Sequence, residues 1–97
     1  MQDIYQRAKR IRLAIFDVDG VLTDGSLYLT DSGEELKAFN VRDGHGMKML
    51  QAGGVRLGII TSRTSRCVEL RAENLGIDLL YHGVSDKLVA FQELLAR

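Results

Sequence analysis

Two apolar runs of strand length, IRLAIF at 11–16 and VRLGII at 55–60, constrain the fold of this chain more than any other feature. Runs without a polar face are typical of strands that are buried on both sides in parallel sheets. A shorter strand is expected at 77–81 (IDLLY). Because segments with helical features separate these runs, the sequence predicts an α/β fold with a parallel sheet and right-handed crossovers.

Four segments have helical features, and glycines or polar residues punctuate them. They are 3–10, 43–52, 66–75 and the segment after Asp86. Gly76 is the expected C′ glycine of the third helix. In the last helix, the helical spacing of Leu88, Phe91 and Leu95 predicts a stripe that faces the core.

The segment 26–41 has a different pattern from the rest of the chain. SLYLT alternates, DSGE supplies a turn and ELKAFNV alternates again, which predicts a β-hairpin with one partly apolar face. A two-stranded hairpin is marginally stable alone, so the face with Leu27 and Leu29, or the one with Tyr28, must pack on something. Pairing with hairpins of neighbouring subunits would cover the strand edges. We therefore expect the hairpin to be an oligomer contact.

Composition excludes several classes of protein. The 97 residues carry 13 Lys+Arg and 13 Asp+Glu, so no broad positive field favours binding to nucleic acid or to an acidic membrane surface. The apolar runs are too short to span a membrane. The single cysteine, Cys67, suits a reducing compartment. These observations predict one domain over residues 1–97 and a cytoplasmic location.

Polar residues with complementary chemistry follow the three predicted strands. Asp17 and Asp19 follow the first strand, Thr61 follows the second, and Lys87 lies shortly after the third. Ligands of parallel sheets bind beyond the carboxyl ends of the strands. A carboxylate can attack phosphorus, while a hydroxyl and an ammonium can hold phosphoryl oxygens beside Mg²⁺. Unpaired backbone N–H groups in the turn at 18–20 are expected to add further donors.

Each of these residues also has a simpler interpretation. The DVDG segment at 17–20 could be only a strand-ending turn, Thr61 could be a helix N-cap, and Lys87 could be a solvated surface lysine. The joint placement at three strand ends favours phosphate chemistry. Zinc binding is not expected, because His45 and His82 are isolated from each other and from any Cys pairing.

The segment DVDGVLTDG at 17–25 resembles the first motif of the haloacid dehalogenase superfamily of phosphatases. The apolar run that ends in Thr61 resembles the second motif, and Lys87 the third. The further order of a hairpin, FNVRDGHGMKML and IITSR is similar to a group of these enzymes that act on sugar-acid phosphates. The resemblance extends from about Ile11 to Arg97.

The resemblance implies a Rossmann-like core with helices on both faces and the hairpin as a minimal cap, assembled as a homotetramer. It implies Mg²⁺-dependent hydrolysis of 3-deoxy-D-manno-octulosonate 8-phosphate in lipopolysaccharide synthesis, through an aspartyl phosphate. Asp17 would be the nucleophile and a metal ligand. Asp19 would offer its backbone carbonyl to the metal and act as general acid and base. Thr61 and Lys87 would bind the phosphoryl group.

The same resemblance implies a set of substrate-contacting residues, because this substrate carries a carboxylate as well as a phosphate. The set is Asn40, Val41, Arg42, Asp43, Gly44, Lys48, Arg63 and Arg71. Guanidinium groups suit carboxylates because they bind them in a bidentate manner. For Arg71 a solvated helix face is the alternative. Ser62 stands where relatives often have glycine.

The superfamily's fourth motif, an acidic block that completes the metal site, does not occur before the chain ends at Arg97. We therefore expect an incomplete core domain with little or no turnover. An alternative function is a weakly active or inactive module for oligomerisation or ligand binding. A signalling receiver domain is a third candidate, but the later strands end in Thr61 and Tyr81 rather than in a phosphorylatable Asp.

Overall fold

A computed structural model describes residues 2–96 of the chain. Its centre is a parallel sheet of three strands in the order β1 (Leu13–Phe16), β4 (Arg56–Ile60) and β5 (Leu79–Tyr81). Phe16 pairs with Ile59, and Ile60 pairs with Tyr81, so the strands end at one edge of the sheet. This register brings the segments that follow the three strands close together.

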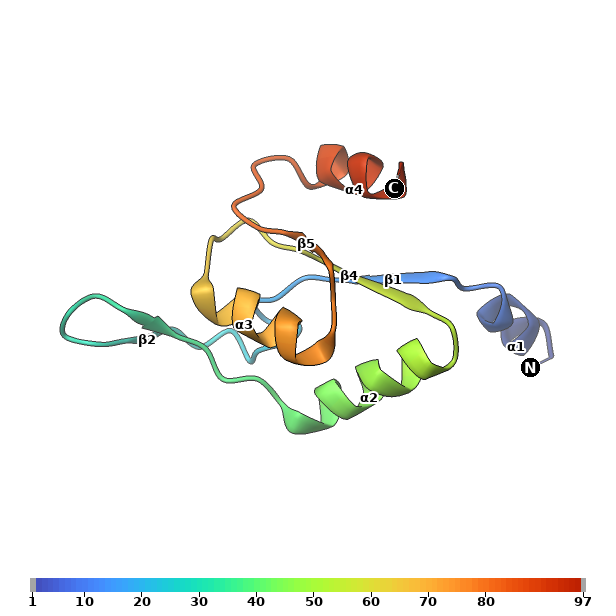
Figure 1. The fold of residues 1–97 in the computed structure, drawn as a ribbon, viewed down its shortest axis with the longest axis horizontal. Helices are drawn as coiled ribbons and strands as arrows, with labels where there is room; N and C mark the ends of the chain where they lie inside the picture. The colour runs from blue at the N-terminus through green and yellow to red at the C-terminus, as the bar shows by residue number, and fades with distance from the viewer. Residues whose placement is uncertain (1, 97) are drawn as a thin grey trace.

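Helices cover both faces of the sheet, as predicted. α2 (Val41–Ala52) and α3 (Arg66–Leu75) lie on one face, and α4 (Lys87–Leu95) lies on the other (Figure 1). The larger core cluster joins β4 to α2 and α3 through Leu57, Ile59 and other side chains that are nearly inaccessible to solvent. α1 (Gln2–Lys9) forms as expected and lies at the end of the molecule opposite the hairpin (Figure 1). Within residues 2–96, no helix combines the length and the apolar character that crossing a membrane requires.

The two longer apolar strands, β1 and β4, differ in burial. β4 is central, and its residues from Leu57 onward are buried. β1 is an edge strand of this sheet, and all four of its residues are only partly buried. The expectation of burial on both sides is therefore met by β4 and not by β1, because β1 has a hydrogen-bonded neighbour on one side only among the described residues.

The hairpin forms, with shorter strands than the alternating pattern predicted. β2 (Tyr28–Leu29) pairs with β3 (Glu35–Leu36) in an antiparallel register. Residues 37–40 of the predicted second strand are not in a strand, and α2 begins at Val41 instead of Asp43. Asn40 caps this helix by accepting a hydrogen bond from the backbone N–H of Arg42 at 2.8 Å.

The predicted core stripe of α4 is wrong. Leu88 and Leu95 are 63% and 57% exposed, and Phe91 is 38% exposed, whereas Ala90 and Leu94 are buried. The helix is apolar over most of its surface, so helical spacing fits more than one stripe. Tertiary packing selects Leu94, since Gly58 of β4 has no side chain: a Cβ built there would lie 3.1 Å from Leu94 Cδ1.

Candidate active site

The ends of β1 and β5 bring a carboxylate and an ammonium together across 70 positions of sequence. Asp17 directly follows β1, and Lys87 is the first residue of α4, after the N-cap Asp86. Lys87 Nζ donates to Asp17 Oδ2 at 2.9 Å. Both side chains are about half exposed, so a ligand can reach them. Lys87 is therefore not a lysine that only solvent surrounds.

The Asp17 carboxylate is held in its ionised form. Partial burial by itself would raise the pKa of Asp17, but the hydrogen bond from Lys87 and the one from the Val18 backbone N–H lower it more. The net effect is a pKa below the ordinary value of an aspartate. A carboxylate that stays ionised at neutral pH is the form that can attack an electrophile or bind a cation.

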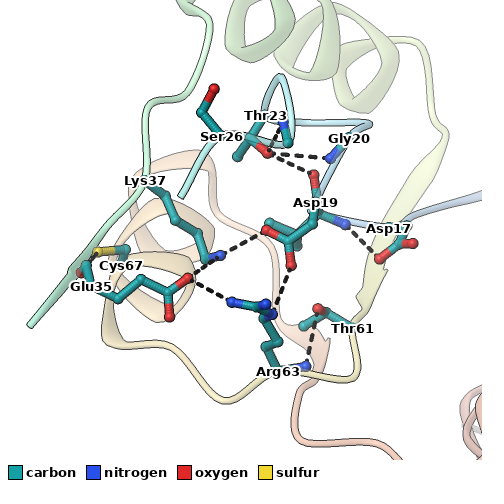
Figure 2. A network of polar contacts seen from close by, with 12 residues as sticks. Asp17, Asp19, Gly20, Thr23, Ser26, Glu35, Lys37, Thr61, Arg63 and Cys67 are labelled. Carbon is teal, nitrogen blue, oxygen red and sulfur yellow. Dashed lines mark hydrogen bonds and ion pairs between the residues drawn. The ribbon is translucent and has the colours of Figure 1, made fainter. Parts of the chain in front are cut away.

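The loop after Asp17 is organised by its own polar groups (Figure 2). The Val18 N–H donates to Asp17 Oδ1 at 2.8 Å, and the N–H groups of Gly20 and Gly25 donate to Thr23 Oγ1 at 3.3 and 3.2 Å. Gly20 has a φ of 81°, a region that favours glycine. The expectation that the N–H groups at 18–20 are unpaired is therefore wrong for Val18 and Gly20.

Thr61 directly follows the central strand β4 and is buried, and its hydroxyl accepts a hydrogen bond from the Arg63 backbone N–H at 3.5 Å (Figure 2). Its backbone N–H donates to the Tyr81 carbonyl at 2.9 Å, and its own carbonyl accepts from Val84 at 3.1 Å, which fixes its position. Thr61 does not cap α3, because the N-cap of that helix is Ser65. The helix-cap alternative is thus excluded.

Four charged side chains form a closed ring of alternating sign beside the loop (Figure 2). Lys37 Nζ lies 2.7 Å from Asp19 Oδ1 and 2.8 Å from Glu35 Oε1. Arg63 closes the ring, with Nη1 3.3 Å from Glu35 Oε1 and Nε 3.6 Å from Asp19 Oδ2. The Lys37 hydrogen bond holds the pKa of Glu35 below its usual value. For Lys37, burial lowers the pKa, but the bonds to Asp19 and Glu35 outweigh burial and raise it.

Sequence reasoning missed Lys37 and Glu35, although it placed Arg63 near the site. The spacing of Glu35 and Lys37 could have indicated that they act together, since residues two apart in a strand share a face. The alternating pattern of the hairpin does not show which part of the chain packs against that face. The fold supplies it by placing the hairpin beside the loop that contains Asp19.

The predicted substrate-contacting residues lie in three places: around the start of α2, near Gly76 at the end of α3, and beside Asp19. The first group surrounds the start of α2, where Asn40 is the cap and Asp43 lines an open pocket of about 370 Å³. Arg71 of α3 reaches the same place: its Nη2 donates to the Asn40 carbonyl at 3.5 Å, and its guanidinium lies 5.9 Å from the centre of the Phe39 ring. Gly44 adjoins the Arg71 guanidinium so closely that any side chain there would displace it.

Not all the predicted contacts converge on Asp17. Val41 is 82% exposed, and Arg42 is also exposed, at the start of α2. Gly44 is a buried residue inside α2. Lys48 Nζ lies near Gly76, at the C-terminal end of α3, whereas Arg63 lies beside the loop that precedes this helix. The structure brings Arg63 close to Asp19 and places Lys48 elsewhere.

The described residues offer few ligands for a metal ion. No cluster of three or more His, Cys, Asp or Glu side chains suited to a metal occurs in the described part of the chain. Asp17 supplies one accessible carboxylate. Mg²⁺ commonly binds one or two carboxylates together with waters and phosphate oxygens. The donor set at Asp17 fits Mg²⁺ in this sparse form and does not fit a closed zinc site.

No protein-family model matches this chain. Curated relatives do match it. It is 56% identical over 94 residues to the 3-deoxy-D-manno-octulosonate 8-phosphate phosphatase of Yersinia pestis and 50% identical over 95 residues to that of Escherichia coli K12. These matches cover 97% and 98% of this chain and 50% of each relative. The chain thus spans about half the length of the curated relatives it matches.

Solved structures agree with this similarity. The Yersinia pestis phosphatase superimposes with a TM-score of 0.91 at 56% identity, over 97% of this chain and 51% of that one. The corresponding enzyme of Moraxella catarrhalis, solved with a magnesium ion, a phosphate ion and a KDO molecule, gives 0.91 at 46% identity, over 99% and 55%. A putative haloacid dehalogenase (HAD) superfamily hydrolase of Legionella pneumophila gives 0.92 at 45%, over 99% and 53%. The chain is therefore a close homologue of these phosphatases and shares their fold.

Proposed function

We propose that this chain forms part of the active site of a Mg²⁺-dependent phosphatase that hydrolyses a sugar-acid phosphate, 3-deoxy-D-manno-octulosonate 8-phosphate. One observation carries the proposal: the Asp17 carboxylate and the Lys87 ammonium meet at 2.9 Å at the edge of the sheet where Thr61 follows the central strand. The homology to phosphatases that bear this substrate in their names supports it. Residues 1–97 belong to one phosphatase core domain in this proposal.

The nucleophile of the proposed reaction is the Asp17 carboxylate. One of its oxygens forms a bond to phosphorus while the bond from phosphorus to the sugar oxygen breaks, which gives an aspartyl phosphate. Lys87 and Thr61 hold the phosphoryl oxygens and stabilise the charge that spreads over them. Lys87 is already directed at this place, because it hydrogen-bonds to Asp17.

Asp19 handles the protons in both halves of the proposed reaction. Its carboxyl group gives a proton to the departing sugar oxygen and later takes one from the water that attacks the aspartyl phosphate. The second step releases inorganic phosphate and restores the Asp17 carboxylate. Asp19 lies two residues from Asp17 in a loop that Thr23 holds in place, so both carboxyl groups come from one ordered segment.

Mg²⁺ would be held by the Asp17 carboxylate and the Asp19 backbone carbonyl, with water and phosphate oxygens as its other ligands. When bound, it supplies positive charge that offsets the charge of the phosphate dianion. Arg63 and Arg71 are the proposed partners of the substrate carboxylate. Arg63 is the better placed of the two, since its half-exposed side chain already contacts the Asp19 carboxylate.

The direct test is an assay of phosphate release from 3-deoxy-D-manno-octulosonate 8-phosphate by the purified chain, with and without Mg²⁺, beside an Asp17→Asn variant. The proposal predicts release that requires both Mg²⁺ and Asp17, at a low rate because the described residues offer only a sparse set of ligands for the metal. Equal release by the variant would contradict it. Binding of phosphate or Mg²⁺ without turnover would instead support the alternative of a ligand-binding or oligomerisation module.

The hairpin is the proposed contact of a cytoplasmic homotetramer. Leu27, Tyr28 and Leu29 are 54%, 47% and 63% exposed in the single chain, and covering such side chains stabilises an assembly by about 25 cal/mol per Å² of apolar surface. We predict an oligomer by light scattering at micromolar concentration, and dissociation in Leu29→Asp. Ser32→Asp, in the turn of the same hairpin, is the matched control and should leave the mass unchanged. A monomeric wild-type chain would contradict the prediction.

A further inference from the structure

We infer that Lys37 is a positioning residue that fixes the Asp19 carboxylate and thereby joins the hairpin to the catalytic loop. The inference rests on the proposed function, because it concerns how the proton-transferring group of that reaction is held. It starts from burial: only 3% of the Lys37 side chain is exposed, which is rare for a lysine. A buried ammonium requires partners, and Lys37 has Asp19 and Glu35.

Lys37 and Arg63 hold Asp19 in different ways. Lys37 Nζ donates to Oδ1 at 2.7 Å from a buried position. Arg63 Nε lies 3.6 Å from Oδ2, too far for a good hydrogen bond, and its side chain is 52% exposed. Arg63 also donates from Nη1 to Glu35 Oε1 at 3.3 Å, so a turn toward a substrate carboxylate would break this long hydrogen bond, while the shorter Lys37 hydrogen bond to Oδ1 would remain.

The hairpin side of this contact is also anchored. Glu35 of β3 accepts from Lys37 through Oε1 at 2.8 Å, and its backbone carbonyl accepts from Cys67 Sγ of α3 at 3.5 Å (Figure 2). Lys37 thus links the loop after β1 to a strand that is itself tied to α3. A change in the hairpin, such as packing against another subunit, would act on Asp19 through this ammonium.

Leaving-group dependence separates positioning of Asp19 from a purely structural role. An alkyl phosphate needs a proton on its departing oxygen, whereas acetyl phosphate has a good leaving group and needs none. We expect Lys37→Met to lower turnover of 3-deoxy-D-manno-octulosonate 8-phosphate by about 10- to 100-fold, a part of what a general acid contributes. Phosphorylation of Asp17 by acetyl phosphate should change by less than about twofold. Lys37→Arg should restore part of the lost rate.

Lys9→Met is the matched control, because Lys9 is an exposed lysine of α1 far from the hairpin. An equal loss with both substrates in Lys37→Met would mean that Lys37 only supports the fold, and no loss with either would mean that it does not act on Asp19. Either result overturns the inference.

A second measurement does not depend on catalysis and separates this inference from the proposed function. In ¹⁵N NMR of the wild-type chain, the Lys37 ammonium should exchange slowly with water, unlike that of Lys9, and should shift in Asp19→Asn. If neither substrate reacts but this signal behaves as expected, the proposed function fails while the contact stands. A Lys37 signal that resembles the one of Lys9 and ignores Asp19→Asn overturns the inference.

Discussion

Leu94→Ala should lower the free energy of unfolding by about 2–4 kcal/mol, whereas Leu95→Ala, one residue further along α4, should cost less than about 1 kcal/mol. Leu94 is 3% exposed and packs with Ile60, Leu79 and Ala90 in the smaller core cluster, whereas Leu95 is 57% exposed. Removing the buried side chain leaves a cavity between α4 and β4. Removing the exposed one leaves only solvent.

Urea denaturation followed by circular dichroism measures both variants against the wild-type chain. The two substitutions are chemically identical and lie in the same helix, so their effects on helix propensity cancel in the comparison. Leu88→Ala, another exposed leucine of the predicted stripe, should behave like Leu95→Ala. A larger loss for Leu95→Ala than for Leu94→Ala would mean that α4 packs through the face predicted from its spacing.

Lys87→Met should reduce phosphoryl transfer from the sugar-acid phosphate by about 10²- to 10³-fold, the usual cost of removing one donor to a developing charge. Methionine matches the unbranched aliphatic stem of lysine and lacks the ammonium, which is the group that reaches Asp17 Oδ2. Because Lys87 and Asp17 are about half exposed, the loss of their ion pair should change the free energy of unfolding by less than about 1 kcal/mol.

Steady-state kinetics and urea denaturation on the same preparation separate the two effects. Lys9→Met, which removes an exposed lysine from α1, is the control for the loss of one positive charge. A fall in activity that only follows a fall in stability would assign Lys87 a structural role. Unchanged kinetics in a folded Lys87→Met variant would remove it from the phosphate site.

The parts of the fold that local patterns determine could be predicted from the sequence. Gly76 ends α3 with a φ of 70°, and Asp86 caps α4 with hydrogen bonds to Leu88 and Val89. Parallel strands also placed Asp17 and Lys87 at one edge, which the 2.9 Å contact bears out. Such features depend on residues near in sequence, or on a rule of parallel sheets that applies to every strand end.

Features that depend on tertiary partners could not be predicted in this way. The choice of Leu94 over Leu95 depends on Gly58, a residue of β4 that helix periodicity does not include. Nothing in the alternating pattern of the hairpin distinguishes Lys37, because its partner Asp19 lies 18 positions earlier in the chain. Sequence periodicity indicates which residues can face the core, and packing against neighbouring elements determines which of them are buried.

The central claim is that the Asp17 carboxylate bonds covalently to phosphorus. Fluoroberyllate mimics a phosphoryl group on an aspartate, and ¹⁹F NMR with Mg²⁺ present detects it when it is bound to protein. The wild-type chain should give bound fluorine signals that are lost in Asp17→Asn and kept in Lys9→Met. Absence of a bound signal from the wild-type chain, or the same signal from Asp17→Asn, would contradict the account.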